Sequence, residues 1–200
     1  MIGGIGYCVI YCLARFILFF WHPVLHVKGR ENVPKNQRLV ICANHNGMAD
    51  PFWICLALRL GHLPRIMAKR EAMELPVIGF IMKKVGIIGV DREIADVHAV
   101  KEGLRALRDD QQLLIFPEGT RVKYRGQVEP KRGAVTMAAR TDTAILPVYI
   151  SRRRYPWQPV TVSIAPSFFV EYAGKRATDE ELVQASRQLM DVIYAMEETV

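Results

Sequence analysis

His45 and Asp50 are the two residues whose types and spacing first suggest chemistry in this sequence. They lie between an apolar run at 39–43, typical of a buried strand, and a proline that suits the first turn of a helix. A carboxylate at one ring nitrogen holds a histidine in one tautomer, so that the other nitrogen can take a proton from a hydroxyl group. By spacing alone, a loop histidine beside a helix-capping aspartate is the commoner explanation.

The segment FPEGTR at 116–121 is the second candidate. Gly119 allows close approach of the backbone to a ligand, and Arg121 can present a forked guanidinium to a phosphate or carboxylate. Glu118 could hold that arginine or bind a substrate hydroxyl. In isolation, a turn with a surface ion pair explains the segment at least as well.

Lys69 and Arg92 are cations that follow two further apolar runs, and each alone could be an ordinary solvated side chain. In open α/β sheets, however, ligands bind beyond the carboxyl ends of the strands. His45, the FPEGTR segment and both cations all follow predicted strands. Together they predict one site for an anionic substrate.

Other chemistries lack their signatures in this chain. None of its four serines lies in a nucleophile elbow, and neither a phosphate-binding loop nor a dinucleotide glycine fingerprint occurs. The four cysteines have apolar surroundings, which indicates buried free thiols in a reducing cytosol. His62 and His98 are interpreted as surface or packing residues, and no metal site is predicted.

The elements that must position these residues alternate between strands and helices. Strands are expected at 24–29, 39–43, 65–69, 87–90, 113–116, 144–150 and within 160–170. Helices are expected from Asp50, at 75–86, 92–110 and 133–140, and after a capping box that begins at Thr178. The pattern predicts one α/β domain over 24–200, with a largely parallel or mixed central sheet flanked by helices.

Residues 1–23 differ from the rest of the chain because Arg15 is their only charged residue. Their length allows a span of ~20 apolar residues, but a central arginine costs roughly 2.5–3.5 kcal/mol on insertion scales. Pro23 then interrupts the helix. We expect a membrane-associated helix lying in one leaflet, with a true span or a buried core helix as the alternatives.

The net charge of +7 and the pI of about 9.4 indicate a polyanionic partner. Nucleic acid, an anionic membrane face and phosphorylated substrates all fit this charge. A nucleic-acid binder is the least favoured of these, because the sequence lacks aromatic and basic residues interleaved on one face.

The candidate residues fall within segments that resemble the 1-acylglycerol-3-phosphate acyltransferases of the glycerolipid acyltransferase family. Residues 44–50 match its N-H-x-S-x-x-D motif, with Gly47 in place of serine. Residues 86–92 match G-x-x-F-V-D-R, with Gly89 at the aromatic position. The third motif, FPEGTR, is complete, although valine rather than serine follows it.

The resemblance extends in order over about residues 24 to 150. Ile145–Val148 resembles the family's apolar strand with proline, and Lys131 with Gly133 resembles its K-x-G stretch. Four motifs in register are far more specific than any one of them. The departures at Gly47 and Gly89 leave the histidine in place and bear on substrate preference.

The resemblance implies a direct acyl transfer without a covalent enzyme intermediate. Asp50 would orient His45, which would take the proton of the sn-2 hydroxyl of a lysophosphatidic-acid-like acceptor. Lys69, Arg92 and Arg121 would hold the acceptor phosphate, while Glu118 and Gly119 would shape the pocket. The product would be phosphatidic acid, in phospholipid biosynthesis.

The resemblance also implies the partners. The acyl donor would be acyl-CoA or an acyl carrier protein thioester, as a co-substrate, and neither a cofactor nor a metal would be required. The apolar N-terminal segment would press into the cytosolic face of the cell membrane. Two alternatives remain open: a related acyltransferase acting on glycerol 3-phosphate or a lyso-aminolipid, and a membrane-binding module without enzymatic activity.

Overall fold

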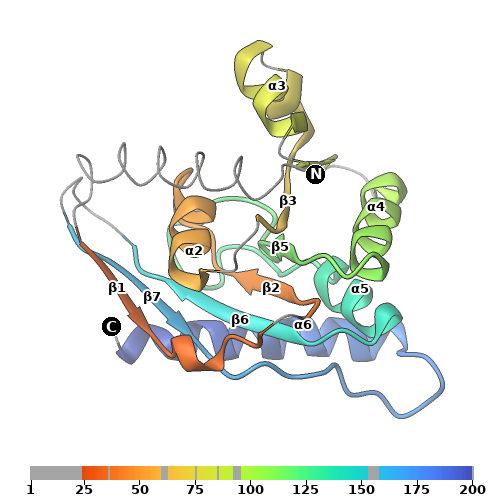
Figure 1. The fold of residues 1–200 in the computed structure, drawn as a ribbon. Helices are drawn as coiled ribbons and strands as arrows, with labels where there is room; N and C mark the ends of the chain where they lie inside the picture. The colour runs from red at the N-terminus through yellow and green to blue at the C-terminus, as the bar shows by residue number, and fades with distance from the viewer. Residues whose placement is uncertain are drawn as a thin grey trace.

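Short apolar strands form the centre of the fold, a seven-stranded sheet with the order β1-β7-β6-β2-β5-β3-β4 (Figure 1). The computed structural model describes residues 24–35, 37–59, 63–74, 76–84, 86–91, 96–152 and 158–199. The strands are β1 (Leu25–Lys28), β2 (Val40–Ala43), β3 (Arg65–Lys69), β4 (Ile88–Val90), β5 (Leu113–Ile115), β6 (Ile145–Ile150) and β7 (Val160–Ile164). Neighbouring strands are parallel except for the antiparallel pair β6–β7, so the sheet is mixed and largely parallel, as expected.

Alternate residues of each central strand supply two separate hydrophobic cores. In β2, Val40 and Cys42 face one core, while Ile41 and Ala43 face the other. All four are fully buried, which explains why the strand appears in the sequence as a continuous apolar run. The sheet is therefore the middle layer of a three-layer α/β domain.

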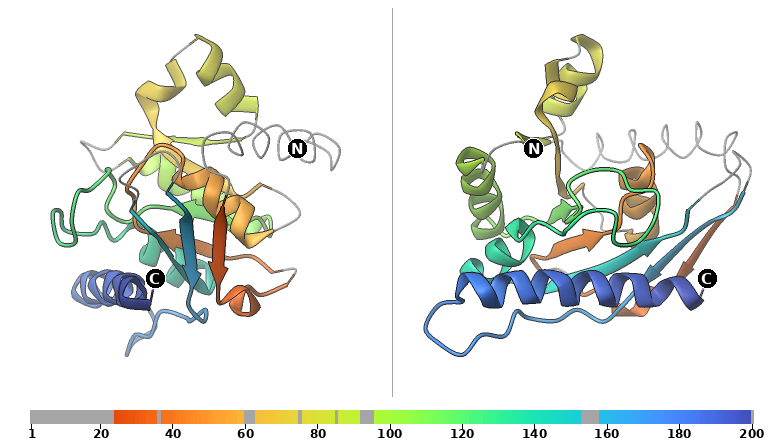
Figure 2. Two further views of the ribbon diagram at one scale, coloured as in Figure 1. Left: turned by 90° about the vertical axis from the view of Figure 1, so that its left-hand side faces the viewer. Right: turned by 180° about the vertical axis from the view of Figure 1, so that it is seen from behind.

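The helices are α2 (Asp50–Leu58), α3 (Pro76–Lys84), α4 (Val97–Arg108), α5 (Gly133–Thr141) and α6 (Asp179–Ala195), with 3-10 turns η1 (Arg30–Asn32), η2 (Arg70–Glu74) and η3 (Met196–Thr199). Buried side chains of α2 pack on one face of the sheet, and those of α4, α5 and α6 pack on the other. Helix α3 stands away from the body of the domain in every view (Figures 1 and 2).

The predicted strands and helices are confirmed in the described part of the chain. Helix α4 begins only after Asp96, whose side chain accepts a hydrogen bond from the Ala99 N–H at 2.9 Å. The predicted capping box is present at α6, where Thr178 and Glu181 satisfy each other's backbone N–H groups at 2.7 and 3.2 Å. Helix α6 then runs along one side of the domain (Figure 2).

Two predictions from the sequence concern, wholly or in part, residues 1–23, which the structure does not describe. The helix predicted for residues 1–23 lies outside the described residues. Among the helices that the structure does describe, none combines the length and the apolar character needed to cross a bilayer. Of the four cysteines predicted to be buried free thiols, Cys42 and Cys55 are confirmed, and burial raises the pKa of the Cys55 thiol to about 12. Cys8 and Cys12 lie outside the described residues.

Candidate active site

The carboxyl ends of β2 and β5 bring the two main sequence motifs together. The two strands are parallel neighbours, with Val40 opposite Leu113 and Cys42 opposite Ile115. The loop that carries His45 follows β2, and the FPEGTR segment follows β5. The Val122 N–H donates to the His45 carbonyl oxygen at 2.9 Å, which fastens one loop to the other.

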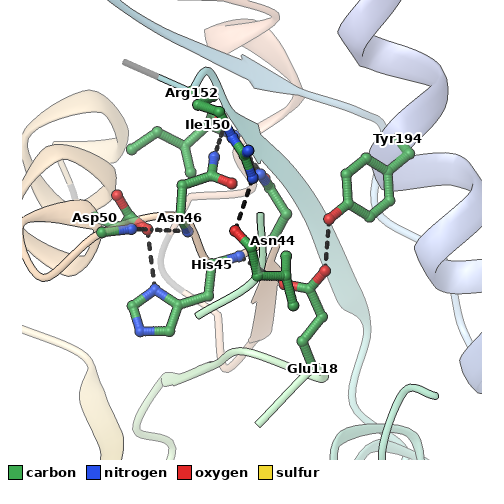
Figure 3. Close-up of polar contacts among 10 residues, drawn as sticks. Asn44, His45, Asn46, Asp50, Glu118, Ile150, Arg152 and Tyr194 are labelled. Carbon is green, nitrogen blue, oxygen red and sulfur yellow. Dashed lines mark hydrogen bonds and ion pairs between the residues drawn. The ribbon is translucent and has the colours of Figure 1, made fainter. Parts of the chain in front are cut away.

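Asp50 holds the imidazole of His45 from the first turn of α2. His45 Nδ1 lies 2.9 Å from Asp50 Oδ2 (Figure 3). The same oxygen accepts the backbone N–H groups of Asn46 and Gly47 at 2.6 and 2.7 Å. Asp50 is only 1% exposed, and it is the first residue of α2 rather than its N-cap, which is Ala49. The carboxylate thus serves to shape the loop and orient the ring.

The second ring nitrogen of His45 is available for chemistry. Nε2 forms no hydrogen bond with any residue in the described part of the chain, and it points away from Asp50 in Figure 3. Phe116 stacks on the imidazole, with ring centroids 4.2 Å apart and an interplanar angle of 24°. Stacking on one face and a carboxylate at Nδ1 fix the plane of the ring, and a fixed ring is what a general base requires.

Glu118 lies behind the His45 loop with its carboxylate buried. Its Oε2 accepts the backbone N–H of His45 at 2.8 Å, and its Oε1 accepts the hydroxyl of Tyr194 at 2.5 Å. Burial raises the pKa of Glu118 above its ordinary value, although the hydrogen bonds from Tyr194 and His45 act in the opposite direction. Contact with a substrate hydroxyl, which the sequence left open, would have to reach a side chain that is only 5% exposed.

Two asparagines fasten the His45 loop to the end of β6. Asn44 donates its side-chain amide to the Ile150 carbonyl at 3.0 Å and accepts the Ile150 N–H at 2.8 Å. Asn46 donates to the same carbonyl at 2.8 Å (Figure 3). The histidine therefore lies in a loop with hydrogen bonds to three parts of the structure: α2, the FPEGTR loop and β6.

The structure describes two of the three predicted cationic residues, Arg121 and Lys69, and they differ in their partners. Arg121 is exposed, and it forms no ion pair or hydrogen bond with the residues that the structure describes. It immediately precedes Val122, which is bonded to His45. Lys69 lies at the end of β3, half exposed, with its ammonium 2.8 Å from Glu71. Arg92 is outside the described residues.

Lys69 lies in the part of β3 that pairs with β4 rather than with β5. Strand β3 pairs with β5 only through Arg65 and Ile66. It then continues beyond β5 and pairs with β4 through its last residues, up to Lys69. Among the described residues, no hydrogen bond or ion pair joins Lys69 to His45 or Glu118.

Comparison with known proteins identifies the family. The sequence model of the acyltransferase family matches residues 24–151. The chain belongs to the acyltransferase family. This confirms the resemblance that the motifs predicted, and the match covers the sheet from β1 to the end of β6, including both loops of the candidate site.

Individual relatives of this acyltransferase-family chain carry a more specific name. This chain is 32% identical over 124 residues to a 1-acyl-sn-glycerol-3-phosphate acyltransferase of Borreliella burgdorferi, and the match covers 61% of this chain and 49% of the relative. It is 34% identical over 124 residues to the Bacillus subtilis protein of that name, covering 60% and 59%. The chain thus spans about half the length of these relatives.

A solved structure shares the fold of this acyltransferase-family chain. The crystal structure of the 1-acyl-sn-glycerophosphate acyltransferase PlsC from Thermotoga maritima matches with a TM-score of 0.70. The match covers 97% of this chain and 79% of the PlsC chain, at 22% sequence identity. At that identity the likeness concerns the architecture alone.

Sequence reasoning missed several residues that build the site in this family member. Asn46 occupies a variable position of the first motif, and its bond to Ile150 depends on how β6 lies beside β2. Tyr194 lies in α6, where its position on the buried face of an amphipathic helix gave no sign of a polar partner. Its partner Glu118 is 76 residues away in the chain, and only the tertiary fold brings the two together.

Gly119→Ala is expected to destabilise this acyltransferase-family protein. Gly119 has a φ of +66°, a left-handed conformation that costs a residue with a Cβ roughly 1–2 kcal/mol. The added Cβ would also lie 3.0 Å from Lys131 Cε. Urea unfolding followed by circular dichroism should show a lower midpoint.

Gly133→Ala is the matched control for this stability measurement. It stands at the start of α5, where a Cβ would meet no heavy atom within 4 Å. Its unfolding midpoint should stay the same or rise slightly, because alanine restricts the unfolded chain. Equal losses in the two variants would contradict the assignment of strain to Gly119.

Proposed function

We propose that this protein transfers an acyl chain from an acyl thioester to the sn-2 hydroxyl of 1-acylglycerol 3-phosphate, giving phosphatidic acid. The observation that carries the proposal is the His45–Asp50 pair, with Nδ1 bound to a buried carboxylate oxygen at 2.9 Å and Nε2 left for a substrate. Membership of the acyltransferase family and the names of the relatives support the same activity.

In this mechanism His45 acts as a general base. Nε2 takes the proton of the acceptor hydroxyl while the hydroxyl oxygen attacks the thioester carbonyl carbon. The new C–O ester bond forms, the C–S bond breaks, and the departing thiolate receives the proton from the imidazolium. Asp50 orients the ring throughout and stabilises the imidazolium while it carries the proton. The acyl thioester is the only co-substrate that these steps require.

The acceptor phosphate is assigned to Arg121, with Lys69 and Arg92 as further cations. In 1-acylglycerol 3-phosphate the reacting hydroxyl and the phosphate occupy neighbouring carbons, so the base and the principal cation must lie in neighbouring loops. Arg121 satisfies this condition, because the next residue, Val122, is bonded to the His45 carbonyl. Its exposed guanidinium can form two parallel hydrogen bonds with phosphate oxygens.

Gly119 and Glu118 are assigned to the walls of the phosphate pocket. Gly119 lies at a left-handed turn beside the Lys131 side chain. Glu118 supports the pocket from behind, through its bond to the His45 N–H.

Residues 1–23 are proposed to hold the protein on the cytosolic face of the cell membrane. Their apolar content suits the lipid phase, Arg15 disfavours a central span, and Trp21 favours the interface. The net charge of +7 adds attraction to anionic lipid headgroups. A lipid acceptor embedded in the bilayer would then lie within reach of the site.

His45→Ala is expected to lower acyl transfer by ~10²–10⁴-fold or more, because the reaction loses its base. The purified protein should be assayed with acyl-CoA and with acyl carrier protein thioester. Each donor should be paired with 1-acylglycerol 3-phosphate, glycerol 3-phosphate and a lyso-aminolipid. The acceptor that the wild type prefers decides between the proposed function and its close alternatives.

His98→Ala provides the control for loss of a histidine. His98 is an exposed residue of α4, and its removal should leave transfer unchanged. A His45→Ala protein that retained wild-type transfer would refute the base assignment and favour a membrane-binding module without enzymatic activity.

Arg121→Lys is expected to raise the KM for the acceptor while the donor KM stays close to wild type. Lysine keeps the charge but cannot present the planar fork that grips two phosphate oxygens. Steady-state kinetics with each substrate varied in turn measures both constants. Arg140→Lys, at the end of α5 away from the strand carboxyl ends, should change neither. An equal rise in both constants would contradict a phosphate role for Arg121.

Removal of residues 1–23 is expected to release the protein from vesicles that contain anionic phospholipid, as measured by flotation. Transfer to acceptor embedded in a bilayer should fall, because the enzyme no longer resides at the lipid surface. Transfer to detergent-dispersed acceptor should fall less. Continued flotation of the shortened protein with the vesicles would show that the rest of the chain suffices for attachment.

A further inference from the structure

Helix α6 lies antiparallel to the segment 118–132 and is tied to it at successive points. Moving forward along α6, the contacts move backward along that segment. They are Asp179 with Arg132 at 2.7 Å, Ser186 with the Lys131 carbonyl at 3.2 Å, Arg187 with Glu129 at 3.2 Å, Asp191 with Arg125 at 2.6 Å and Tyr194 with Glu118 at 2.5 Å. The family match ends at residue 151, so this helix lies beyond it.

The contact between Tyr194 and Glu118 differs from the ion pairs in that series. The side chains of the three ion pairs are all between about half and three-quarters exposed, and such pairs contribute little to stability. Glu118 and Tyr194 are instead 5% and 7% exposed. A buried carboxylate without a donor is costly, and a short bond from a hydroxyl to a carboxylate is among the stronger hydrogen bonds.

The Glu118 carboxylate links the Tyr194 hydroxyl to the backbone of His45. One carboxylate oxygen accepts the Tyr194 hydroxyl, and the other accepts the His45 N–H at 2.8 Å (Figure 3). Fixing the first oxygen sets the rotation of the carboxylate, and that rotation sets where the His45 N–H is held. We propose that Tyr194 is a positioning residue for acyl transfer, acting through Glu118 on His45. This inference rests on the proposed function.

The neighbouring tyrosine provides a contrast within the same cluster. The rings of Tyr149 and Tyr194 meet edge to face with centroids 6.3 Å apart. Both residues are buried, but the hydroxyl of Tyr149 is directed at Glu197 rather than at Glu118. The Arg125 guanidinium lies over the Tyr194 ring, 5.7 Å from its centroid. Replacement of either tyrosine with phenylalanine removes the hydroxyl and keeps the ring. Of the two hydroxyls, only that of Tyr194 is hydrogen-bonded to Glu118.

The phenol also affects the pH at which Glu118 is protonated. Within the described part of the chain, the titratable groups that act on Glu118 are Tyr194, His45 and Asp50. Burial raises the pKa of Glu118, and the hydrogen bond from Tyr194 counteracts part of that rise. Without the hydroxyl the pKa of Glu118 should rise further. In a protein without the Tyr194 hydroxyl, Glu118 would therefore become protonated at a higher pH than in the wild type. Protonation would weaken its hydrogen bond to the His45 N–H.

Tyr194→Phe, with Tyr149→Phe as its control, tests the proposal. Loss of the hydroxyl should lower kcat roughly 10–100-fold with little change in either KM, since misplacement of a reacting group slows the reaction without weakening binding. The acid limb of the kcat profile should move to higher pH. Tyr149→Phe should leave both quantities at their wild-type values. A wild-type kcat and acid limb in Tyr194→Phe, or the same change in both variants, would overturn the proposal.

A second measurement does not depend on activity. The amide proton of His45 is hydrogen-bonded to the Glu118 carboxylate, so its NMR chemical shift should report the titration of that group. The midpoint should move to higher pH in Tyr194→Phe, and an unchanged midpoint would overturn the link between the two residues. If the wild type acylates none of the acceptors with either donor, the proposed function fails, while the amide titration still decides whether Tyr194 acts on the His45 loop.

Discussion

A single carboxylate oxygen, Oδ2 of Asp50, is the constraint on which the candidate site depends. It accepts two backbone N–H groups of the loop that precedes it and lies 2.9 Å from the imidazole of that same loop. These interactions serve two purposes at once, because the loop conformation and the ring orientation are set by one atom. Since Asp50 is buried at the start of α2, its position is fixed in turn by the packing of that helix against the sheet.

The sheet topology explains why such a loop can meet a second one. Parallel strands place their following loops at one edge, and β5 and β6 lie on either side of β2. The His45 loop therefore has a neighbour on each side, and it is bonded to both: to Glu118 and Val122 after β5, and to Ile150 at the end of β6. The position of the His45 loop is thus set by strand adjacency more than by any one motif.

Much of this arrangement could be predicted from local sequence. The run at 39–43 indicated a strand buried on both faces, and Thr178 with Glu181 indicated the start of a helix, because these signals depend on neighbouring residues alone. The position of both segments directly after predicted strands likewise indicated that the loops with His45 and Glu118 would meet. The contact of Tyr194 with Glu118 could not be predicted, because the two residues are 76 positions apart and a tyrosine on the buried face of a helix usually only packs in the core. The sequence also could not show that Lys69 lies where β3 pairs with β4 rather than with β5.

The antiparallel path of α6 along segment 118–132 has a consequence for the biosynthesis of the protein. A chain leaves the ribosome from its N-terminus, and the His45 and FPEGTR loops emerge well before residue 194. The pairing of β1 with β7, in which Leu25 lies opposite Val160, also requires residues that are synthesised late. The nascent chain can therefore assemble β2, β5 and β6 early, yet it lacks the buried partner of Glu118 until α6 has been made. The hydrogen bonds behind the His45 loop would thus be completed late in synthesis, when residue 194 becomes available.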